Sequence, residues 1–536
     1  MMLHQNAIKR FGDNQSKATV ERYCTNLKLL LNSFRKTFPL SKPTEFSRMK
    51  KFSAAILLLL WGCSSLLPPS PPPDPVNRLR HDIDTVLADS LFRQSQACIK
   101  IVSLNTGQVL YDRNSTLLIH PASNLKLLTS ASALQILGAN FRFKTSVLAD
   151  SQQSGPSVFG NLYLKGYGDP DLSVCDLDSL AANIRSMGIR EITGNIVADD
   201  SYFDDLYWGN GWMWDDEPDP DEMFISALSV NKNCIAVTIT PTATVSDSVI
   251  VTVDPPTPYV TVQCNARTVG DTTDYSLNVS RLYKERSNTV TIDGDIPKTS
   301  PPHRARVSVW RPALFAAELL KESLLRDSIV VSGAARLGTA SPRAVELACR
   351  WRPIDSVLIT MNKISDNLSA ENLLKTIGAL QRVIPGSAQN GIYVENEFLK
   401  SFGIDTSACS IVDGSGVSHY NLVTVDQIMQ VLIGMARRPN PFHLIYTSLP
   451  IAGVDGTLQS RMVGTSAQGN VRGKTGTING VSSLSGYVTT HDGEILAFSM
   501  VMENFILPVR SYQLVQDRIC ELLARFSRKL PLSASR

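Results

Sequence analysis

A serine and a lysine one helical turn apart, Ser123 and Lys126, form a pair of side chains whose spacing could support covalent chemistry. They lie in the segment 121–134, where Pro121 and short polar residues mark a helix start and leucine and alanine cover every face. We therefore predict a buried helix with both side chains on one face. A serine hydroxyl near a helix N-terminus, beside a lysine shielded from water, suits a nucleophile and its base.

The Ser-x-x-Lys spacing is weak evidence by itself, because the chain contains it three more times, at Ser33–Lys36, Ser47–Lys50 and Ser229–Lys232. Two later motifs distinguish the first copy. Ser365-Asp366-Asn367 and Lys474-Thr475-Gly476 follow it in the order found in penicilloyl serine enzymes. Together the three motifs predict an acyl-transfer site with five catalytic residues: Ser123, Lys126, Ser365, Asn367 and Lys474.

The short polar side chains of the second motif suit proton transfer. Ser365 can relay a proton between Lys126 and a leaving amine. Asn367 can hydrogen-bond both Lys126 and a substrate amide. The motif lies where one helical pattern ends and the next begins, so an ordinary helix N-cap is an alternative explanation of this tripeptide.

The third motif has the parts needed to hold a terminal carboxylate of a substrate. Lys474 supplies a positive charge at a sheet edge, which strengthens hydrogen bonds to a carboxylate. Thr475 and Thr477 supply hydroxyl groups, and Gly476 leaves room for a substrate backbone. We expect these residues to bind the substrate beside the reacting bond.

Hydrophobic patterns at both ends of the chain predict the elements that position these motifs. The expected elements are an amphipathic helix over 77–94, a β-hairpin over 97–112, a three-stranded meander over 471–502 and a C-terminal helix over 511–526. Together they predict an α+β fold, in which a five-stranded antiparallel sheet flanked by helices lies against the Ser123 helix. This transpeptidase-like domain would comprise residues 77–148 and 341–536.

Between residues 149 and 340 short β-type runs alternate with Gly, Pro and Asp, which predicts a mainly β insert of one or two subdomains. Its acidic segment, residues 199–222, holds ten acidic residues, no basic residue and six aromatic residues. The segment could bind a cationic or sugar-bearing ligand, with Asp200 as the first acidic candidate and Phe203 and Trp212 as walls. The alternative is a solvated loop whose aromatic side chains pack on the insert. Its spacing does not match a calcium-binding loop.

The first 76 residues predict export and tethering. Residues 49–62 carry two lysines and a short apolar core, as in a signal peptide, and we interpret residues 1–48 as an upstream extension. Cys63 resembles the lipidated cysteine of bacterial lipoproteins, although Trp61 stands where a smaller residue is usual; conventional cleavage is the alternative. Residues 63–76 read as a proline-rich tether. We expect a periplasmic protein with a possible membrane lipid anchor.

Composition narrows the remaining function classes. With 43% hydrophobic and 19% charged residues, the 536-residue chain is globular and long enough for two or three domains. The excess of positive charge lies in the first 62 residues, so nothing favours nucleic-acid binding. The seven cysteines after Cys63 form no CxxC pair and no Cys/His cluster, so we predict no metal or redox site, no cofactor and mostly free thiols.

The motifs together resemble those of the class C penicillin-binding proteins, the D-alanyl-D-alanine carboxypeptidases/endopeptidases. The resemblance covers about residues 77 to 525 and includes the long insert and the segments 166–170, 362–367, 413–416 and 474–477. It implies the penicilloyl-serine transferase fold. His419 departs from the pattern, since arginine is expected after the Asp413-Gly-Ser-Gly416 turn.

The resemblance implies acyl transfer on peptidoglycan stem peptides, with β-lactam antibiotics as covalent inhibitors. Ser123 would attack the carbonyl of the penultimate D-Ala with Lys126 as base, and the backbone N–H groups of Ser123 and Thr477 would form the oxyanion hole. The leaving group, D-alanine or an amine, would be protonated through Ser365, and water would deacylate the enzyme.

Two other functions fit the same sequence less well. A non-catalytic peptidoglycan-binding lipoprotein could keep the fold as a scaffold, although every chemical position is filled. A β-lactamase would need fast deacylation, and no residue is identifiable as a dedicated deacylating base. The balance of carboxypeptidase and endopeptidase activity, and the residue at position three of the stem peptide, stay open.

Overall fold

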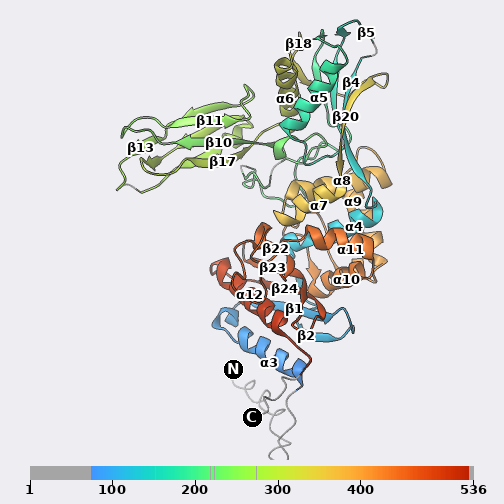
Figure 1. Ribbon diagram of the computed structural model, residues 1–536, viewed down its shortest axis with the longest axis vertical. Helices are drawn as coiled ribbons and strands as arrows, with labels where there is room; N and C mark the ends of the chain where they lie inside the picture. The colour runs from blue at the N-terminus through green and yellow to red at the C-terminus, as the bar shows by residue number, and fades with distance from the viewer. Residues whose placement is uncertain (1–73, 151, 218, 223, 273, 530–536) are drawn as a thin grey trace, which may run out of the picture. The chain divides into compact units, whose positions relative to one another are not determined.

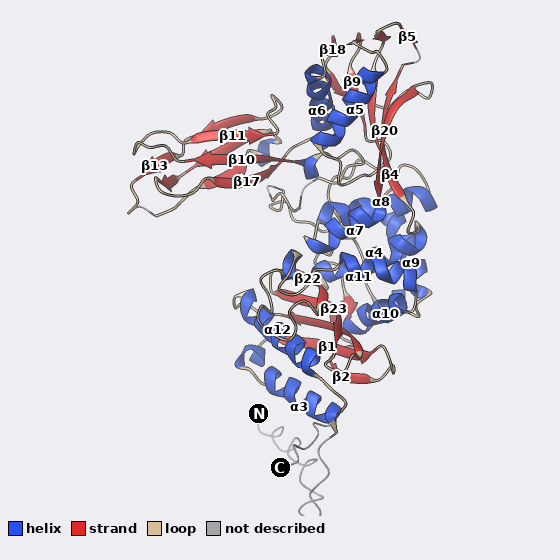
Figure 2. Ribbon diagram, in the orientation of Figure 1, coloured by secondary structure: helices blue, strands red, loops and turns tan. Residues whose placement is uncertain are grey.

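An antiparallel sheet joins the two ends of the described chain (Figures 1 and 2). The computed structural model describes residues 74–529 except residues 151, 218, 223 and 273. The strand order is β2-β1-β24-β23-β22. The strands are β1 (Gln96–Ser103), β2 (Val109–Arg113), β22 (Arg472–Ile478), β23 (Val481–Thr489) and β24 (Ile495–Glu503). The predicted five-stranded sheet built from both chain ends is therefore confirmed.

Helices cover both faces of this sheet, because successive strand residues point to opposite sides and both sides are apolar. Ile99 and Ile101 of β1 lie in a core with α3 (Pro75–Leu87) and α12 (Val509–Arg525). Cys98 and Val102 face a second core, built with a group of mostly buried helices. These helices are α4 (Lys126–Ile136), α7 (Ile354–Lys363), α8 (Asn367–Gln381), α9 (Ala388–Lys400), α10 (Val425–Ala436) and α11 (Pro439–Ser448).

The first helix is shorter than the predicted span 77–94. Val76, Leu79, Ile83 and Leu87 are buried at helical spacing, as the amphipathic pattern predicts. The helix ends there because Asp89 caps a separate 3-10 turn, Ser90–Arg93, by accepting a hydrogen bond from the backbone N–H of Leu91.

The insert begins with a second five-stranded sheet, of order β19-β9-β7-β4-β20. Its strands are β4 (Arg142–Ala149), β7 (Leu162–Gly166), β9 (Ile196–Asp199), β19 (Ala335–Leu337) and β20 (Val345–Pro353), and α5 (Val174–Ser186) and α6 (Pro312–Arg326) share its core. Because β4 pairs with β20, the insert closes on itself at residues 142 and 353. This pairing extends beyond the predicted span of 149–340 at both ends.

The rest of the insert is β-structure, as expected. One sheet pairs β10 (Cys234–Thr240) with β11 (Ile250–Asp254) and β17 (His303–Ser308), and another pairs β15 (Thr289–Asp293) with β12 (Thr261–Cys264) and β14 (Asn278–Arg281). Two short pairs complete it: β13 (Arg267–Val269) with β16 (Asp295–Pro297), and β5 (Gln152–Ser154) with β6 (Ser157–Phe159), the latter extended by β8 (Glu191–Ile192) and β18 (Val330–Val331).

Some predictions concern residues that the structure does not describe. The upstream extension, the signal peptide, Cys63 and most of the tether fall within residues 1–73, outside the described part. Between residues 74 and 529, none of the described helices combines the length and apolar character that a bilayer span requires. The seven cysteines of this part are unpaired: Cys98, Cys175, Cys234, Cys264, Cys349, Cys409 and Cys520.

Candidate active site

Ser123 and Lys126 lie at the start of the buried helix, but the first turn differs from the predicted α-helix. Residues Ala122–Leu125 form a 3-10 turn, η3, and the α-helix α4 begins at Lys126. Ala122 has a left-handed backbone with φ of +47°. Since non-glycine residues rarely adopt this conformation, the turn is held by its surroundings, as is common at functional sites.

Lys126 is fully buried and its ammonium group makes three hydrogen bonds. Nζ donates to Ser123 Oγ at 2.9 Å, to Asn367 Oδ1 at 2.6 Å and to the carbonyl oxygen of Ser415 at 2.7 Å. Burial lowers the pKa of Lys126 to about 8, and the negative charges of nearby acids, Asp413 first, oppose this shift. A lysine in this setting can lose its proton near neutral pH and then accept one from Ser123.

Lys474 lies close enough to Lys126 to feel its charge, and it contacts Ser365. Its Nζ donates to Ser365 Oγ at 2.8 Å and to the carbonyl of Thr475 at 2.9 Å. Burial, and then the positive charge of Lys126, hold the pKa of Lys474 well below its usual range. Ser365 itself has a left-handed backbone with φ of +65°. The expected relay residue thus contacts Lys474, whereas Asn367 contacts Lys126.

The second motif also caps a helix, as its alternative explanation states. Asp366 is the N-cap residue of α8 and accepts a hydrogen bond from the backbone N–H of Ser369 at 2.8 Å. Its two neighbours, Ser365 and Asn367, point to the two lysines. The cap therefore fixes the backbone from which both catalytic side chains project.

The turn at 413–416 is a functional element that the sequence did not identify as a lysine ligand. Asp413 accepts hydrogen bonds from the backbone N–H groups of Gly416 and Ser418 and from the side chain of Asn421, each at 2.8 Å. Gly416 has φ of +84°, and a Cβ atom there would lie 1.9 Å from the carbonyl oxygen of Ala122. Only glycine therefore lets the turn approach the Ser123 segment closely enough to offer the Ser415 carbonyl to Lys126.

The buried acid Glu371 stabilises the turn at 413–416 through hydrogen bonds to its backbone. Glu371 of α8 accepts hydrogen bonds from the backbone N–H groups of Gly414, at 3.0 Å, and Ser415, at 2.8 Å. Burial, and then the charge of Asp413, raise the pKa of Glu371 to about 7. Its sequence position in an ordinary helical pattern gave no sign of this role.

Strand β22 approaches the nucleophile through a glycine, as the third motif predicts. A Cβ atom on Gly476 would lie 2.8 Å from the backbone nitrogen of Ser123 and 2.2 Å from Ser483 Oγ. Thr475 Oγ1 donates to Thr457 Oγ1 at 2.7 Å, and Thr477, which follows Gly476, is exposed. The two segments that carry Ser123 and Thr477 thus lie in close contact at Gly476.

The acidic segment reaches this centre, but through other residues than Asp200 and Phe203. The half-buried Asp200 accepts a 3.4 Å hydrogen bond from Ser226 Oγ, and burial raises its pKa. Phe203 is only 4% exposed and packs with the two tyrosines Tyr167 and Tyr202, so its ring is not an open wall. Trp212, in contrast, donates through Nε1 to Asp413 Oδ2 at 3.1 Å.

Two further residues of the segment interact with Asn367 and Lys126. The carbonyl of Asp221 accepts a hydrogen bond from Asn367 Nδ2 at 2.8 Å. Glu222 is one of the acids whose charge acts on Lys126. Burial, and then the charge of Asp216, raise the pKa of Glu222 to about 8. Composition identified this segment, but it could not tell which acids face the site.

In the part of the chain that the structure describes, no three side chains of His, Cys, Asp or Glu are grouped to hold an ion. His419, the departure from the expected arginine, faces His120 with ring centroids 5.5 Å apart. His120 in turn contacts Glu503 Oε2 through Nδ1 at 3.2 Å.

Comparison with known proteins gives consistent matches over most of the chain. Residues 79–525 match the D-Ala-D-Ala carboxypeptidase 3 (S13) family. The D-alanyl-D-alanine carboxypeptidase of Actinomadura sp. (strain R39) is 35% identical over 467 residues, which cover 84% of this chain and 85% of that protein. The D-alanyl-D-alanine carboxypeptidase DacB of Haemophilus influenzae is 28% identical over 407 residues, which cover 75% of this chain and 84% of that protein.

Solved structures show the same architecture. The crystal structure of penicillin binding protein 4 (dacB) from Haemophilus influenzae superposes with a TM-score of 0.74 at 26% identity and covers 83% of this chain and 99% of that one. The structure of its complex with a novel β-lactam superposes with a TM-score of 0.68 and covers 82% of this chain and 98% of that one. With a family match over almost the whole described part and a relative at 35% identity, the chain belongs to the D-Ala-D-Ala carboxypeptidase 3 (S13) family of serine hydrolases.

Proposed function

We propose that this protein is a serine D-alanyl-D-alanine carboxypeptidase or endopeptidase that acts on peptidoglycan stem peptides through an acyl-enzyme at Ser123. The observation that carries the proposal is the contact of a fully buried Lys126 with Ser123 Oγ at 2.9 Å. A buried lysine with a lowered pKa is a base matched to neutral pH, and the serine beside it is the nucleophile that it serves.

The reaction follows from the positions of the side chains. Neutral Lys126 takes the proton of Ser123, and Ser123 Oγ attacks the carbonyl of the penultimate D-Ala. The backbone N–H groups of Ser123 and Thr477 stabilise the resulting oxyanion, a role that contributes ~10²–10³ in rate per donor.

The second serine serves the leaving group. Ser365 can donate its proton to the departing amine and recover one from Lys474, whose Nζ is 2.8 Å away. The low pKa of Lys474 makes it an effective proton donor in its charged form. Water then hydrolyses the acyl-enzyme, and β-lactams would acylate Ser123 without rapid release.

Labelling with a fluorescent penicillin tests this proposal. The parent protein should acquire one covalent label, and a folded Ser123→Ala protein should acquire none. Ser229→Ala is the matched control, because Ser229 has the same spacing to a lysine and should leave labelling intact. Label that persists on Ser123→Ala would refute the proposal, and complete absence of label on the parent would favour a non-catalytic wall-binding protein.

The acidic segment supports a more specific proposal about the substrate. Many wall stem peptides carry a free amine some bonds away from the scissile bond, and a carboxylate can bind it as an ammonium ion. The expectation placed this role on Asp200. Glu222, with Asp216 beside it, is better placed, because the charge of Asp216 acts on Glu222 and the charge of Glu222 acts at Lys126.

Export and anchoring complete the proposal. The basic and apolar segment before Cys63 would direct the protein to the periplasm, where its substrate lies, and lipidation of Cys63 would hold it at the membrane. A β-lactamase function has no observation in its favour, since no residue is identifiable as a dedicated base for deacylation.

A further inference from the structure

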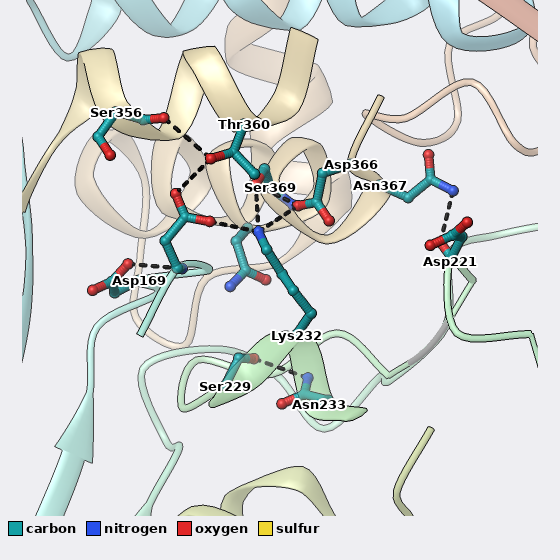
Figure 3. Close-up of polar contacts among 12 residues, drawn as sticks. Asp169, Asp221, Ser229, Lys232, Asn233, Ser356, Thr360, Asp366, Asn367 and Ser369 are labelled. Carbon is teal, nitrogen blue, oxygen red and sulfur yellow. Dashed lines mark hydrogen bonds and ion pairs between the residues drawn. The ribbon is translucent and has the colours of Figure 1, made fainter. Parts of the chain in front are cut away.

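The second Ser-x-x-Lys segment in the described chain, Ser229 to Lys232, lies in the insert directly against the second catalytic motif (Figure 3). Lys232 Nζ lies 2.7 Å from Asp366 Oδ2 and 2.6 Å from Asp171 Oδ1, and it donates to Ser369 Oγ at 3.2 Å. Ser229 Oγ bonds instead to the carbonyl of Ser226 and to the side chain of Asn233. The segment is therefore not a second nucleophile and base.

The environments of Lys232 and Lys126 shift the pKa values of these two lysines in opposite directions. Burial alone would lower the pKa of Lys232, but the charges of Asp366 and Asp171 outweigh it, so its pKa is raised. The ammonium of Lys232 in turn outweighs the effect of burial on Asp366, whose pKa is lowered. Lys232 is therefore a permanent cation between two carboxylates, whereas Lys126 can lose its proton.

The backbone that presents Lys232 is unusual and tightly held. Asn231, Lys232 and Asn233 all have left-handed backbones, with φ of 50°, 56° and 54°. Non-glycine residues rarely adopt this conformation in succession, so it persists only where other contacts enforce it. Here Asn233 Nδ2 donates to the carbonyl of Phe224 at 2.8 Å, and Asn231 Oδ1 accepts from the backbone N–H of Val174 at 3.2 Å.

The receiving end of the contact lies between the two catalytic side chains of the motif. Asp366 separates Ser365, with its left-handed backbone, from Asn367, the first residue of α8. The second partner of Lys232, Asp171, accepts a hydrogen bond from Thr360 of α7 at 3.1 Å. The ammonium group thus ties together the helix before the motif, the motif itself and the start of the helix after it.

We propose that Lys232 is a positioning residue of the catalytic centre, supplied by the insert. Its contact with Asp366 fixes the turn on which Ser365 and Asn367 are mounted, and so keeps each of them on its catalytic lysine. The insert is then a part of the catalytic scaffold as well as a substrate-binding region. This inference rests on the proposed acyl-transfer function.

A charge-removing substitution, Lys232→Met, tests the inference by separating rate from folding. The second-order rate constant for acylation by fluorescent penicillin, the labelled fraction and Tm are measured on one preparation. We expect the rate constant to fall at least tenfold while nearly all folded molecules still take up one label. A purely structural role would lower Tm or the labelled fraction and leave the rate constant of the folded molecules unchanged.

Lys375→Met is the matched control. Lys375 is also a buried lysine that joins α8 to the insert, with Nζ 2.5 Å from Asp204 Oδ1, but it lies two turns beyond the motif. The Lys375→Met protein should be less stable than the parent, but its acylation rate constant should stay within about twofold of the parental value.

Asp366→Asn tests the same contact from the other side and serves if Lys232→Met does not fold. Asparagine is an equally good N-cap but carries no charge, so the helix start is retained while the ion pair is lost. We expect at least a tenfold slower acylation, and little further loss when both substitutions are combined, because they remove one shared interaction.

Three results would overturn the inference: acylation by Lys232→Met at the parental rate, an equal loss of rate in Lys375→Met, or additive losses in the double variant. Failure of the proposed function would look different, because the parent would then carry no label that depends on Ser123.

Discussion

Replacing Glu371 by glutamine should move the pH dependence of acylation to lower pH. Glu371 binds the N–H of Ser415, and the carbonyl of Ser415 binds Lys126 Nζ, so the two charged groups are linked through the backbone of one residue. Burial lowers the pKa of Lys126 to about 8, and the charge of Glu371 is among those that oppose the shift. A glutamine oxygen can accept the same two backbone hydrogen bonds but carries no charge.

The size of the effect follows from the arrangement. Two charges this close inside a protein interact by about 1–2 kcal/mol once the effective dielectric is taken into account, which is about one pKa unit. Because Lys126 must be neutral to take the serine proton, acylation rises with pH through its pKa. The midpoint of that rise should therefore fall by about one pH unit in Glu371→Gln.

The assay is the second-order rate constant for acylation by penicillin, measured from below pH 6 to above pH 9 on protein shown to be folded at each pH. Glu395→Gln is the control, because Glu395 is a fully buried acid that accepts a hydrogen bond from Ser132 and is not hydrogen-bonded to the turn at 413–416. An unchanged midpoint in Glu371→Gln, or an equal shift in Glu395→Gln, would refute the reasoning.

Four other outcomes can be measured. Lys126→Ala should fold and acylate about 10²-fold more slowly or worse, since a serine without its base is a poor nucleophile; near-parental acylation would reassign the base. Glu222→Gln should reduce kcat/KM about tenfold, or 1.4 kcal/mol, for a stem peptide with a free amine but not for its amine-acetylated form, while Asp200→Ala should not; the reverse result would restore Asp200 as the receptor. Cys63→Ser should move the protein from the membrane fraction to the soluble periplasm, and unchanged fractionation would contradict lipidation. Finally, burial raises the pKa of Glu395 to about 8, so the folded state loses stability as pH rises from the unfolded value of ~4.3 to about 8; Tm of Glu395→Gln should fall less over this range, and a parallel fall would show that Glu395 is not the cause.

The sheet and its helices were predictable because their signals are local. Alternating side chains and glycine turns such as Asn479-Gly480 define the meander over β22 to β24, and periodic apolar residues define α3 and α12. The pairing of β1 with β24 joins the predicted hairpin to the predicted meander. The contacts of Ser123 and Asn367 with Lys126 agree with the motif-based prediction for the same reason, since short motifs fix the types of side chain.

Some residues of the site were not predicted from the sequence, because they act through a backbone group or through burial that depends on the tertiary structure. The carbonyl of Ser415 binds Lys126, and a carbonyl has no sequence signature. Glu371 resembles a surface residue of a helix, yet it is completely buried because α8 is covered on all sides. Lys232 was dismissed as a chance copy of a motif, because its two carboxylate partners come from distant segments.

The acidic segment shows the same limit in another form. Its composition suggested a binding segment or a solvated loop, and Trp212 and Asp221 contact Asp413 and Asn367. Composition could not show that Phe203 turns into a local core and that Asp200 faces Ser226. Orientation within a segment rich in turns depends on packing partners, and a single sequence does not reveal them.

The pairing of β1 with β24 also determines when catalytic competence can arise. Ile99 lies opposite Met500, so the sheet beside Ser123 is incomplete until the last part of the chain has been synthesised and, for an exported protein, has crossed the membrane. Lys474 arrives with that same part. Contacts between such distant segments form late and slowly compared with local ones. In a chain that emerges in the order of its sequence, Ser123 would therefore appear long before Lys474 and the completed sheet. It would become an active nucleophile only after the whole protein has folded.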